Sequence, residues 1–117
     1  MNIEQFRDFC LSFHGTTERF PFDDTALVFE VGGRMFAMVA LDRAEFVNLK
    51  CDPDRAVELR ERYAGIRPGW HMNKRHWNSV YLDSDVPDGM ICELVRHSRS
   101  CVIAKLPKSV RELYDKE

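Results

Sequence analysis

The sequence lacks any long apolar run. Its longest unbroken apolar segment, Met35 to Leu41, has seven residues, whereas a membrane-spanning helix needs about 20. The first fifteen residues also lack the pattern of a secretory signal peptide, because Glu4, Arg7 and Asp8 interrupt their apolar residues. We therefore expect a cytoplasmic protein with no membrane partner.

Cysteine is scarce, and none of the four cysteines forms a C-x-x-C pair: they are Cys10, Cys51, Cys92 and Cys101. This spacing excludes a disulfide-rich secreted scaffold and a zinc site built from cysteine pairs. We interpret all four as free thiols in a reducing compartment. A nucleophilic cysteine needs a neighbouring base, and the sequence places none beside Cys51.

The motifs of common enzyme families are also missing. The chain contains no G-x-S-x-G elbow, no P-loop, no G-x-G-x-x-G and no H-E-x-x-H. His71 and His76 are separated by two cations and have no evident third ligand, which argues against zinc. The acids of Asp83-Ser84-Asp85 lack the glycine and distal glutamate of a calcium loop, and we expect them to favour the start of a helix. The sequence thus predicts no enzyme, no metal and no cofactor.

The chain has little excess charge of either sign, and its formal charge of -2 excludes a uniformly basic nucleic-acid-binding protein. The charges are nevertheless unevenly distributed. Residues 1–58 carry eleven acids and six bases, whereas residues 59–117 carry eight acids and eleven bases. Two stretches, 65–82 and 94–111, contain no acid at all. Such stretches fit either a local anionic contact or ordinary solvated faces.

With 117 residues, of which 44% are hydrophobic, residues 1–117 are expected to form a single globular domain. Asn2 and Gln5 form the pattern of a capping box at the start of a first amphipathic helix, which Gly15 ends. Asp52 is a helix cap followed by Pro53 at the first helical position. The pair Gly32-Gly33 predicts a tight hairpin, because both residues can adopt positive φ.

The expected elements alternate in a simple order along the chain. The segment 16–25 is polar and is expected to be a loop. Helices are predicted after Asn2, Asp52 and Pro87, and strands at Ala26–Val31, Arg34–Leu41, Glu45–Lys50, Gly69–Asn73 and Trp77–Leu82. Short connections require antiparallel pairing. The predicted fold class is α+β, a two-layer α-β(3)-α-β(2)-α domain with the helices on one face of an antiparallel five-stranded sheet. Ser98 is the one polar residue on the inward stripe of the third helix.

Alternation along the strands predicts which side chains face away from the helices. Trp77 and Tyr81 in the last strand, and Phe46 and Lys50 in the third, should lie on this open face. Aromatic rings beside cations are typical of surfaces that stack bases and bind phosphates. They are equally typical of protein interfaces. A third alternative is that a long loop folds over them.

The stretch from Arg67 to Val80, RPGWHMNKRHWNSV, resembles the MmcQ/YjbR family of small bacterial proteins. Phe36-Ala37-Met38-Val39, Asn48-Leu49-Lys50 before Asp52-Pro53, and Tyr81-Leu82-Asp83 agree with it, so the resemblance covers essentially the whole chain. The most specific element is His-x-Asn-Lys-x-His-Trp. One departure is Ser98-Arg99, where the family usually has Ser-Tyr.

The resemblance implies the same α-β(3)-α-β(2)-α arrangement, related to the CyaY (frataxin-like) architecture. It also implies a DNA-binding protein with a double-wing motif. An iron site by analogy with frataxin is not expected, because Glu4 and Asp8 are too few acids on the first helix. The candidate binding residues, from the resemblance and the acid-free stretches together, are Lys50, His71, Asn73, Lys74, Arg75, His76, Trp77, Tyr81, Arg96 and Arg99.

Three hypotheses follow from the sequence. The leading one is a non-enzymatic DNA-binding or regulatory domain, in which cations hold phosphates while Trp77 and Tyr81 stack or pack. The second is a protein-interaction or adaptor domain, in homodimeric form or with another partner, that uses the open sheet face. The third is a small-molecule pocket at the turn from His71 to Trp77.

Overall fold

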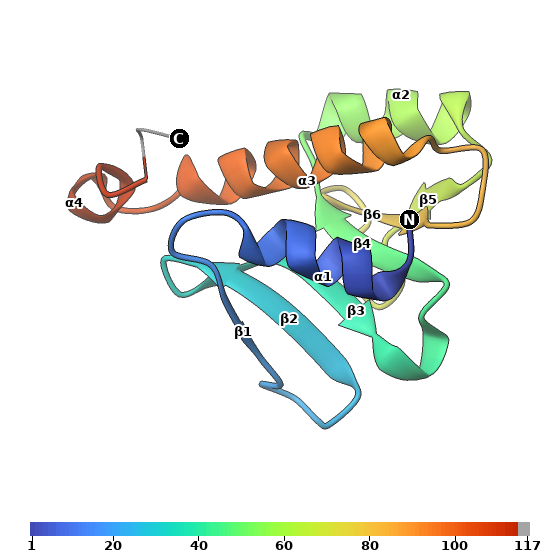
Figure 1. Ribbon diagram of the computed structural model, residues 1–117. Coiled ribbons are helices and arrows are strands. Elements are labelled where there is room, and N and C mark those ends of the chain that lie inside the picture. The colour runs from blue at the N-terminus through green and yellow to red at the C-terminus, as the bar shows by residue number, and fades with distance from the viewer. Residues whose placement is uncertain (115–117) are drawn as a thin grey trace.

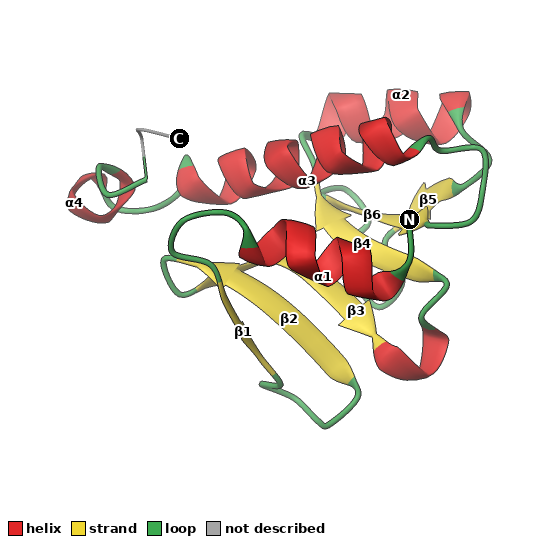
Figure 2. Ribbon diagram, in the orientation of Figure 1, coloured by secondary structure: helices red, strands yellow, loops and turns green. Residues whose placement is uncertain are grey.

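The computed structural model describes residues 1–114. Three helices cover one face of a six-stranded antiparallel sheet, whose strand order is β1-β2-β3-β4-β6-β5 (Figures 1 and 2). The elements are α1 (Ile3–Leu11), β1 (Thr17–Arg19), β2 (Ala26–Val31), β3 (Arg34–Ala40), a 3₁₀ turn (Leu41–Arg43), β4 (Phe46–Lys50), α2 (Pro53–Arg62), β5 (Ile66–Pro68), β6 (Trp77–Tyr81), α3 (Asp88–Ile103) and α4 (Lys108–Arg111). The predicted α+β class is confirmed, and the predicted five strands are one too few.

The predicted helix caps of α1 and α2 are confirmed. The side chain of Asn2 accepts a hydrogen bond from the Gln5 amide at 2.8 Å, and the Gln5 side chain accepts one from the Asn2 amide at 3.0 Å. Asp52 accepts from the amide of Arg55, and Pro53 is the first residue of α2. These bonds satisfy amides that a helix leaves unpaired at its start.

The hairpin between β2 and β3 also forms as predicted. Gly32 and Gly33 have φ values of 59° and 79°, a backbone region that side-chain-bearing residues rarely adopt. The turn lies close to the end of α3, because a Cβ on Gly32 would lie 2.7 Å from Leu106 Cδ1. A tight turn therefore joins the two strands beneath the C-terminal end of the longest helix.

The additional strand, β1, lies in the segment that the sequence predicts as a loop. Glu18 points to the helical side and forms an ion pair with Arg7 of α1 at 2.8 Å, whereas Arg19 pairs with Glu30 of β2 at 2.8 Å. Both faces of this edge strand are therefore polar, so its alternation leaves no hydrophobic signal. Charged edge strands also resist pairing with other chains.

The fourth predicted strand is shifted toward the N-terminus. Residues Ile66–Pro68 form β5 and pair with β6, whereas the predicted segment 69–73 is the start of a turn. Gly69 allows that turn to begin close to β6, because a Cβ there would lie 2.8 Å from the Trp77 Cβ. A strand of three residues followed by a glycine is too short to show an alternating apolar pattern in the sequence.

The acids before α3 do not cap it, contrary to the sequence expectation. The helix begins after Pro87, without a side-chain cap. Asp85 instead accepts hydrogen bonds at 2.8 Å from the amides of Ala64 and Gly65, in the link between α2 and β5. These two bonds lower the pKa of Asp85 by stabilising its ionised carboxylate.

Each helix packs over a different part of the sheet. Phe6 of α1 meets Phe29 of β2 edge-on, with ring centroids 6.1 Å apart. Helix α3 lies over β3 and β4, and α2 lies beside β5 (Figure 1). The core between these layers holds the large apolar side chains, including Phe6, Phe29, Phe36, Leu49 and Ile91, all of them fully buried. Among residues 1–114, no helix has both the length and the apolar character needed to cross a membrane.

A bulge in β3 changes the spacing between the central strands. Phe29 pairs with Ala37, but the next residue of β2, Glu30, pairs with Met35, so Phe36 is an extra residue in β3. Strands β3 and β4 pair only at Ala37–Leu49 and Met38–Asn48. Beyond this point the two strands no longer bond to each other.

The hydroxyl of Ser98 fills the gap that the bulge leaves. This side chain of α3 is fully buried; it accepts a hydrogen bond from the Lys50 amide at 2.8 Å and donates one to the Phe36 carbonyl at 2.5 Å. One hydroxyl therefore satisfies two backbone groups that the separated strands cannot pair with each other. This explains why the inward stripe of α3 contains a serine.

We predict that Ser98→Ala lowers the free energy of unfolding by about 2–4 kcal/mol, because the Lys50 N–H and the Phe36 C=O both lose their partner. Urea-induced unfolding followed by circular dichroism measures the loss. Ser100→Ala is the matched control, since Ser100 is exposed on the same helix and should change stability by less than about 0.5 kcal/mol. Equal small effects of both substitutions would contradict the role given to Ser98.

Candidate functional site

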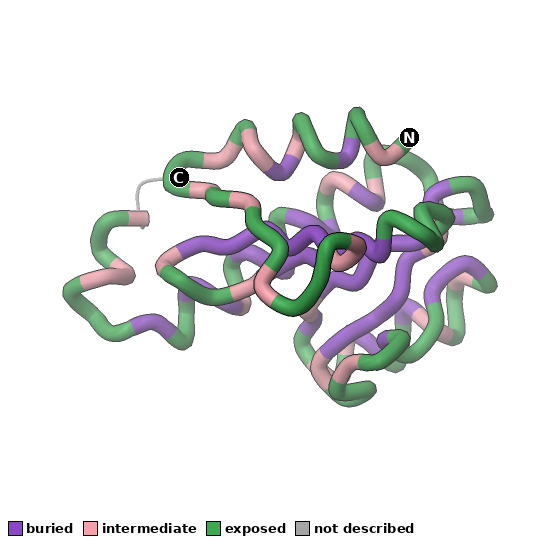
Figure 3. Tube along the Cα trace, turned by 90° about the horizontal axis from the view of Figure 1, so that it is seen from below, coloured by how far each residue is buried: buried purple, intermediate pink, exposed green. Residues whose placement is uncertain are grey.

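The turn 69–76 folds over the face of the sheet that the helices leave open. Two hydrogen bonds hold it there: the Trp70 amide donates to Ser79 Oγ at 2.9 Å, and Asn48 Nδ2 donates to the Trp70 carbonyl at 3.0 Å. Ser79 Oγ in turn donates to Asn48 Oδ1 at 2.6 Å and so links the two supporting side chains. Asn48 and Ser79 are both buried. Seen from below, most strand residues are buried (Figure 3).

Several residues of the family-like segment hold this turn together. Asn73 Oδ1 accepts from the amides of Arg75 and His76 at 2.9 and 3.2 Å, which closes a tight turn. Lys74 Nζ donates to the Gly69 carbonyl at 2.8 Å. Of the predicted binding residues, Asn73 and Lys74 therefore have polar contacts within the turn itself.

The predicted aromatic surface is mostly covered. Trp77 and Phe46 do lie on the open face, as alternation predicts, but only 8% of Trp77 and 3% of Phe46 are exposed. Of the three alternatives for this face, a loop that folds over the rings is what the structure has. Tyr81 is half-buried, with the Arg67 guanidinium 4.7 Å from its ring centroid. Trp77 thus has no free ring face for a base to stack on.

Trp70 is the exposed tryptophan, and the sequence reasoning missed it. Its indole is 36% exposed and meets Phe46 edge-on at 5.7 Å, and the Arg43 guanidinium lies 5.1 Å from its ring centroid. The Pro-Gly pair before it was the available signal, because that pair predicts a turn rather than a strand at this position.

Four basic residues converge at one end of the sheet. Arg34 begins β3, Lys50 ends β4 and His76 directly precedes β6, so antiparallel pairing brings all three to the same end. Lys105 joins them from just beyond α3. Together with Met35 and Val102, these four residues line a hollow of about 600 Å³, which we call the cationic hollow.

No acidic residue lines the cationic hollow. Within residues 1–114, no carboxylate forms a salt bridge with Arg34, Lys50 or Lys105, unlike Arg7 and Arg19, which are paired. The carbonyl end of α3 lies nearby and offsets part of the repulsion among the three cations. A concave surface lined by positive charges attracts anions strongly.

The other predicted cations lie elsewhere. Arg99 is buried, donates to the His14 carbonyl at 2.8 Å and lies near the Phe13 and Tyr114 rings, so it does not form part of a phosphate-binding surface. This corrects the expectation that Arg99 adds to an exposed basic face. Arg96 is exposed above the Phe9 ring in the helical layer.

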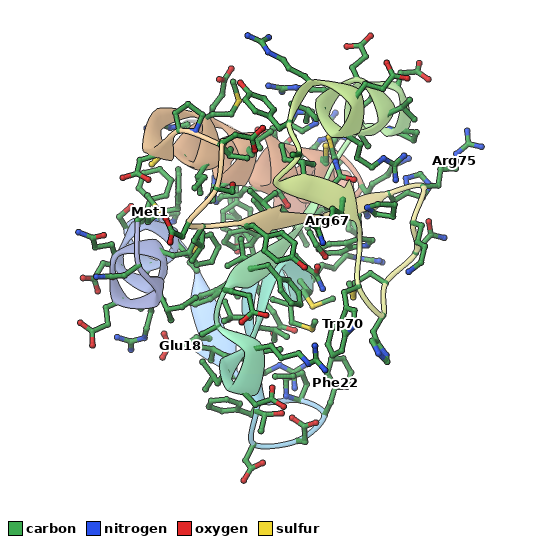
Figure 4. All side chains as sticks on the ribbon, turned by 90° about the vertical axis from the view of Figure 1, so that its right-hand side faces the viewer. Met1, Glu18, Phe22, Arg67, Trp70 and Arg75 are labelled. Carbon is green, nitrogen blue, oxygen red and sulfur yellow. The ribbon has the colours of Figure 1, made fainter. Side chains whose placement is uncertain are left out.

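Four predicted residues of the turn are exposed: His71, Asn73, Lys74 and Arg75. Arg75 projects outward from the fold (Figure 4). His71 is also exposed and has a φ of 56°, which makes it the one non-glycine residue with positive φ among residues 1–114. Of the predicted site, therefore, only Lys50 and His76 lie in the cationic hollow, and sequence reasoning did not select Arg34 or Lys105.

His97 lies near two cysteines, but their arrangement does not activate a thiol. His97 Nε2 accepts a hydrogen bond from the Asp52 amide at 3.1 Å and lies 3.5 Å from Cys101 Sγ. Burial raises the pKa of Cys101, and it raises the pKa of Cys51 to about 11. Burial and the nearby Arg55 lower the pKa of His97. A thiol with a raised pKa is a poor nucleophile at neutral pH.

Metal-ligating side chains do not gather in the described part of the chain. Residues 1–114 contain no group of three or more His, Cys, Asp or Glu side chains placed to bind a metal ion. The neighbouring acids Asp83 and Asp85 are used differently, since Asp85 holds the link before β5.

Comparison with known proteins gives the family. Residues 11–101 match the sequence model of the YjbR family. The chain belongs to the YjbR family. The chain is similar to YjbR of Escherichia coli K12, with 34% identity over 114 residues and 97% of each chain covered. It is also similar to YyaQ of Bacillus subtilis, with 41% identity over 54 residues, which cover 46% of this chain and 45% of that protein. Both relatives are described as uncharacterised.

A crystal structure shows the same fold in this family. The protein DR2400 of Deinococcus radiodurans, assigned to the domain DUF419, is 38% identical and superimposes with a TM-score of 0.89, covering 97% of this chain and 87% of DR2400. A protein of Pseudomonas syringae at 24% identity shares the fold, with a TM-score of 0.73, 86% of this chain covered and 98% of that chain. The MmcQ/YjbR resemblance seen in the sequence is confirmed.

We predict that Trp77→Ala lowers the free energy of unfolding by about 3–5 kcal/mol, because it removes a large buried side chain. Trp70→Ala should cost less than about 1.5 kcal/mol, since this ring is partly exposed and contributes mainly its contact with Phe46. Thermal and urea unfolding of both variants give the comparison. A Trp77→Ala protein as stable as wild type would show that this indole lies at the surface.

Proposed function

We propose that the protein is a non-enzymatic DNA-binding or regulatory domain that holds DNA phosphates in the cationic hollow. The convergence of Arg34, Lys50, His76 and Lys105 without a lining carboxylate supports this proposal. Phosphate contacts supply most of the sequence-independent affinity of DNA-binding proteins. The DNA-binding character implied by the MmcQ/YjbR resemblance agrees with it.

This proposal differs from the sequence hypothesis in the residues that do the binding. Base stacking on Trp77 is dropped, because the ring is buried beneath the turn 69–76. Lys50 and His76 remain, joined by Arg34 and Lys105, whereas Arg99 does not. Binding through phosphates alone should be strongly salt-dependent and tolerant of sequence.

We also propose that the protein works in the cytoplasm. Its cysteines are free thiols, and two of them, Cys92 and Cys101, are only partly buried. Free and partly accessible thiols suit a reducing compartment.

The alternative is a protein-interaction or adaptor domain that uses the open face, as a homodimer or with another protein. Two exposed aromatic side chains favour it, Phe22 and Trp70, which line one cleft on that face. Large exposed aromatic residues are enriched at protein interfaces. This alternative places the partner on the open face and leaves the cationic hollow without a role.

We predict that a labelled duplex binds at low salt and that its affinity falls steeply as salt rises. Charge reversal at Arg34 and Lys105 (Arg34→Glu with Lys105→Glu) should weaken binding at least tenfold. It should also reduce the slope of log affinity against log salt by roughly 1.8, since each lost phosphate contact accounts for about 0.9. Fluorescence anisotropy at several salt concentrations measures both quantities.

The matched control reverses two other exposed arginines, Arg62→Glu with Arg96→Glu. Both lie over aromatic rings of the helical layer, so the control changes net charge equally without altering the hollow. Equal losses of DNA affinity in both double variants would show that only the net charge of the protein matters, and would contradict the proposed site. Absence of binding at low salt, together with a dimer in sedimentation that Trp70→Ala dissociates, would instead establish the adaptor alternative.

A further inference from the structure

A second concave site lies on the open face, and no part of the proposed function uses it. It has a volume of about 450 Å³ and lies between the loop 20–25 and the turn 69–76. We call it the open-face cleft. Its floor and walls are formed chiefly by Phe22, Met35, Met38, Asp42, Trp70 and Met72. Met35 also borders the cationic hollow, so the two sites are neighbours across one side chain.

The cleft is lined by apolar and adaptable side chains. Three methionines contribute to it, and methionine packs well against ligands of varied shape because it is unbranched and polarisable. Phe22 is 70% exposed and Trp70 36% exposed. Both rings line the cleft, and Figure 4 shows them on the same side of the molecule. A flat apolar molecule could enter between these two rings.

The wall that carries Trp70 is fixed in place. The backbone of Trp70 is held on both sides by Asn48 and Ser79, at 3.0 and 2.9 Å. The next residue, His71, also lines the cleft and has the positive φ of 56°. Non-glycine residues in this backbone region are uncommon and cluster at ligand-binding sites. The indole is thus presented by a rigid turn, which lowers the entropic cost of binding a ligand.

The charged groups that line the cleft are acidic. Asp42 lies on the 3₁₀ turn, is exposed, and forms no hydrogen bond or ion pair with any residue in 1–114. Asp23 accepts three hydrogen bonds through Oδ1, from the Thr25 amide, the Thr25 hydroxyl and the Ala26 amide. Those bonds lower the pKa of Asp23, so its carboxylate is ionised at neutral pH.

We propose that the open-face cleft binds a flat aromatic cation, such as an arylalkylammonium ion, with its ring between Phe22 and Trp70 and its ammonium group toward Asp42 and Asp23. Aromatic faces and carboxylates together favour an organic cation over a neutral or anionic molecule of the same shape. The Arg43 guanidinium lies over the Trp70 ring, and lining residues supply two carboxylates against it. The site differs in charge preference from the cationic hollow, and its ligand therefore differs from DNA.

Three indole probes of the same size and different charge test the proposal: tryptamine is cationic, tryptophol is neutral and indole-3-acetate is anionic. The protein is labelled at its methionine methyl groups and titrated with each probe in NMR. Met35, Met38 and Met72 line the cleft, whereas Met1 and Met90 lie outside it and serve as internal controls for the fold. We expect tryptamine to shift the three cleft signals saturably, with an affinity at least about fivefold above that for indole-3-acetate.

Asp42→Asn separates charge recognition from shape. It should weaken tryptamine binding at least about threefold and leave tryptophol binding unchanged. Asp54→Asn is the matched control, because Asp54 is an exposed acid on α2. Trp70→Ala should weaken all three probes.

Three results would overturn the proposal. One is the absence of any shift at the cleft methionines up to millimolar probe; another is equal affinity for tryptamine and indole-3-acetate. The third is unchanged tryptamine affinity in Asp42→Asn. Each of these is independent of DNA binding, so failure here and failure of the proposed function are distinguishable.

Discussion

The structure depends on one hydroxyl group, that of Ser98. The extra residue in β3 separates this strand from β4 at the point where Phe36 and Lys50 would otherwise face each other. Two buried backbone groups without partners would cost several kcal/mol. Ser98 bonds to both and so ties α3 to the two central strands. The strands can then diverge, and Arg34 and Lys50 flank the hollow that results.

The family-like segment around Trp77 determines which side chains this face leaves exposed. Asn73 and Lys74 hold the turn 69–76 together, and Ser79 of β6 holds it against the open face. Trp77 is buried beneath it. The same turn places Trp70 at the open-face cleft. It then leads into β6, with His76 at the cationic hollow. A motif that resembles a binding sequence therefore serves first as the structural support of two neighbouring surfaces.

Local rules predicted the local features well. The capping box at Asn2, the cap at Asp52 and the hairpin at Gly32-Gly33 each depend on residues adjacent in sequence, and all three form as expected. The order of helical and alternating apolar patterns along the chain predicted the α+β class. The same patterns could not predict the polar edge strand β1, because its side chains form ion pairs with α1 and β2 that leave no hydrophobic periodicity.

Contacts between residues distant in sequence determine which side chains meet at the candidate site, and sequence reasoning did not predict these contacts. Alternation correctly placed Trp77 on the open face, but nothing local shows that a turn covers it. Arg99 belongs to an acid-free stretch, yet it is buried against the loop after α1. Arg34 and Lys105 are 71 residues apart in number and meet only because β3 begins where α3 ends. Charge counts show how many cations exist, whereas topology determines which of them meet.

The most direct test of this account is an amide NMR titration of the isotope-labelled protein with a short DNA duplex at low salt. The account predicts that the largest shift changes cluster at Arg34, Lys50, His76 and Lys105, four positions distant in sequence and adjacent only in the fold. Changes confined to Arg75 or Arg96, or no changes at low salt, would contradict it.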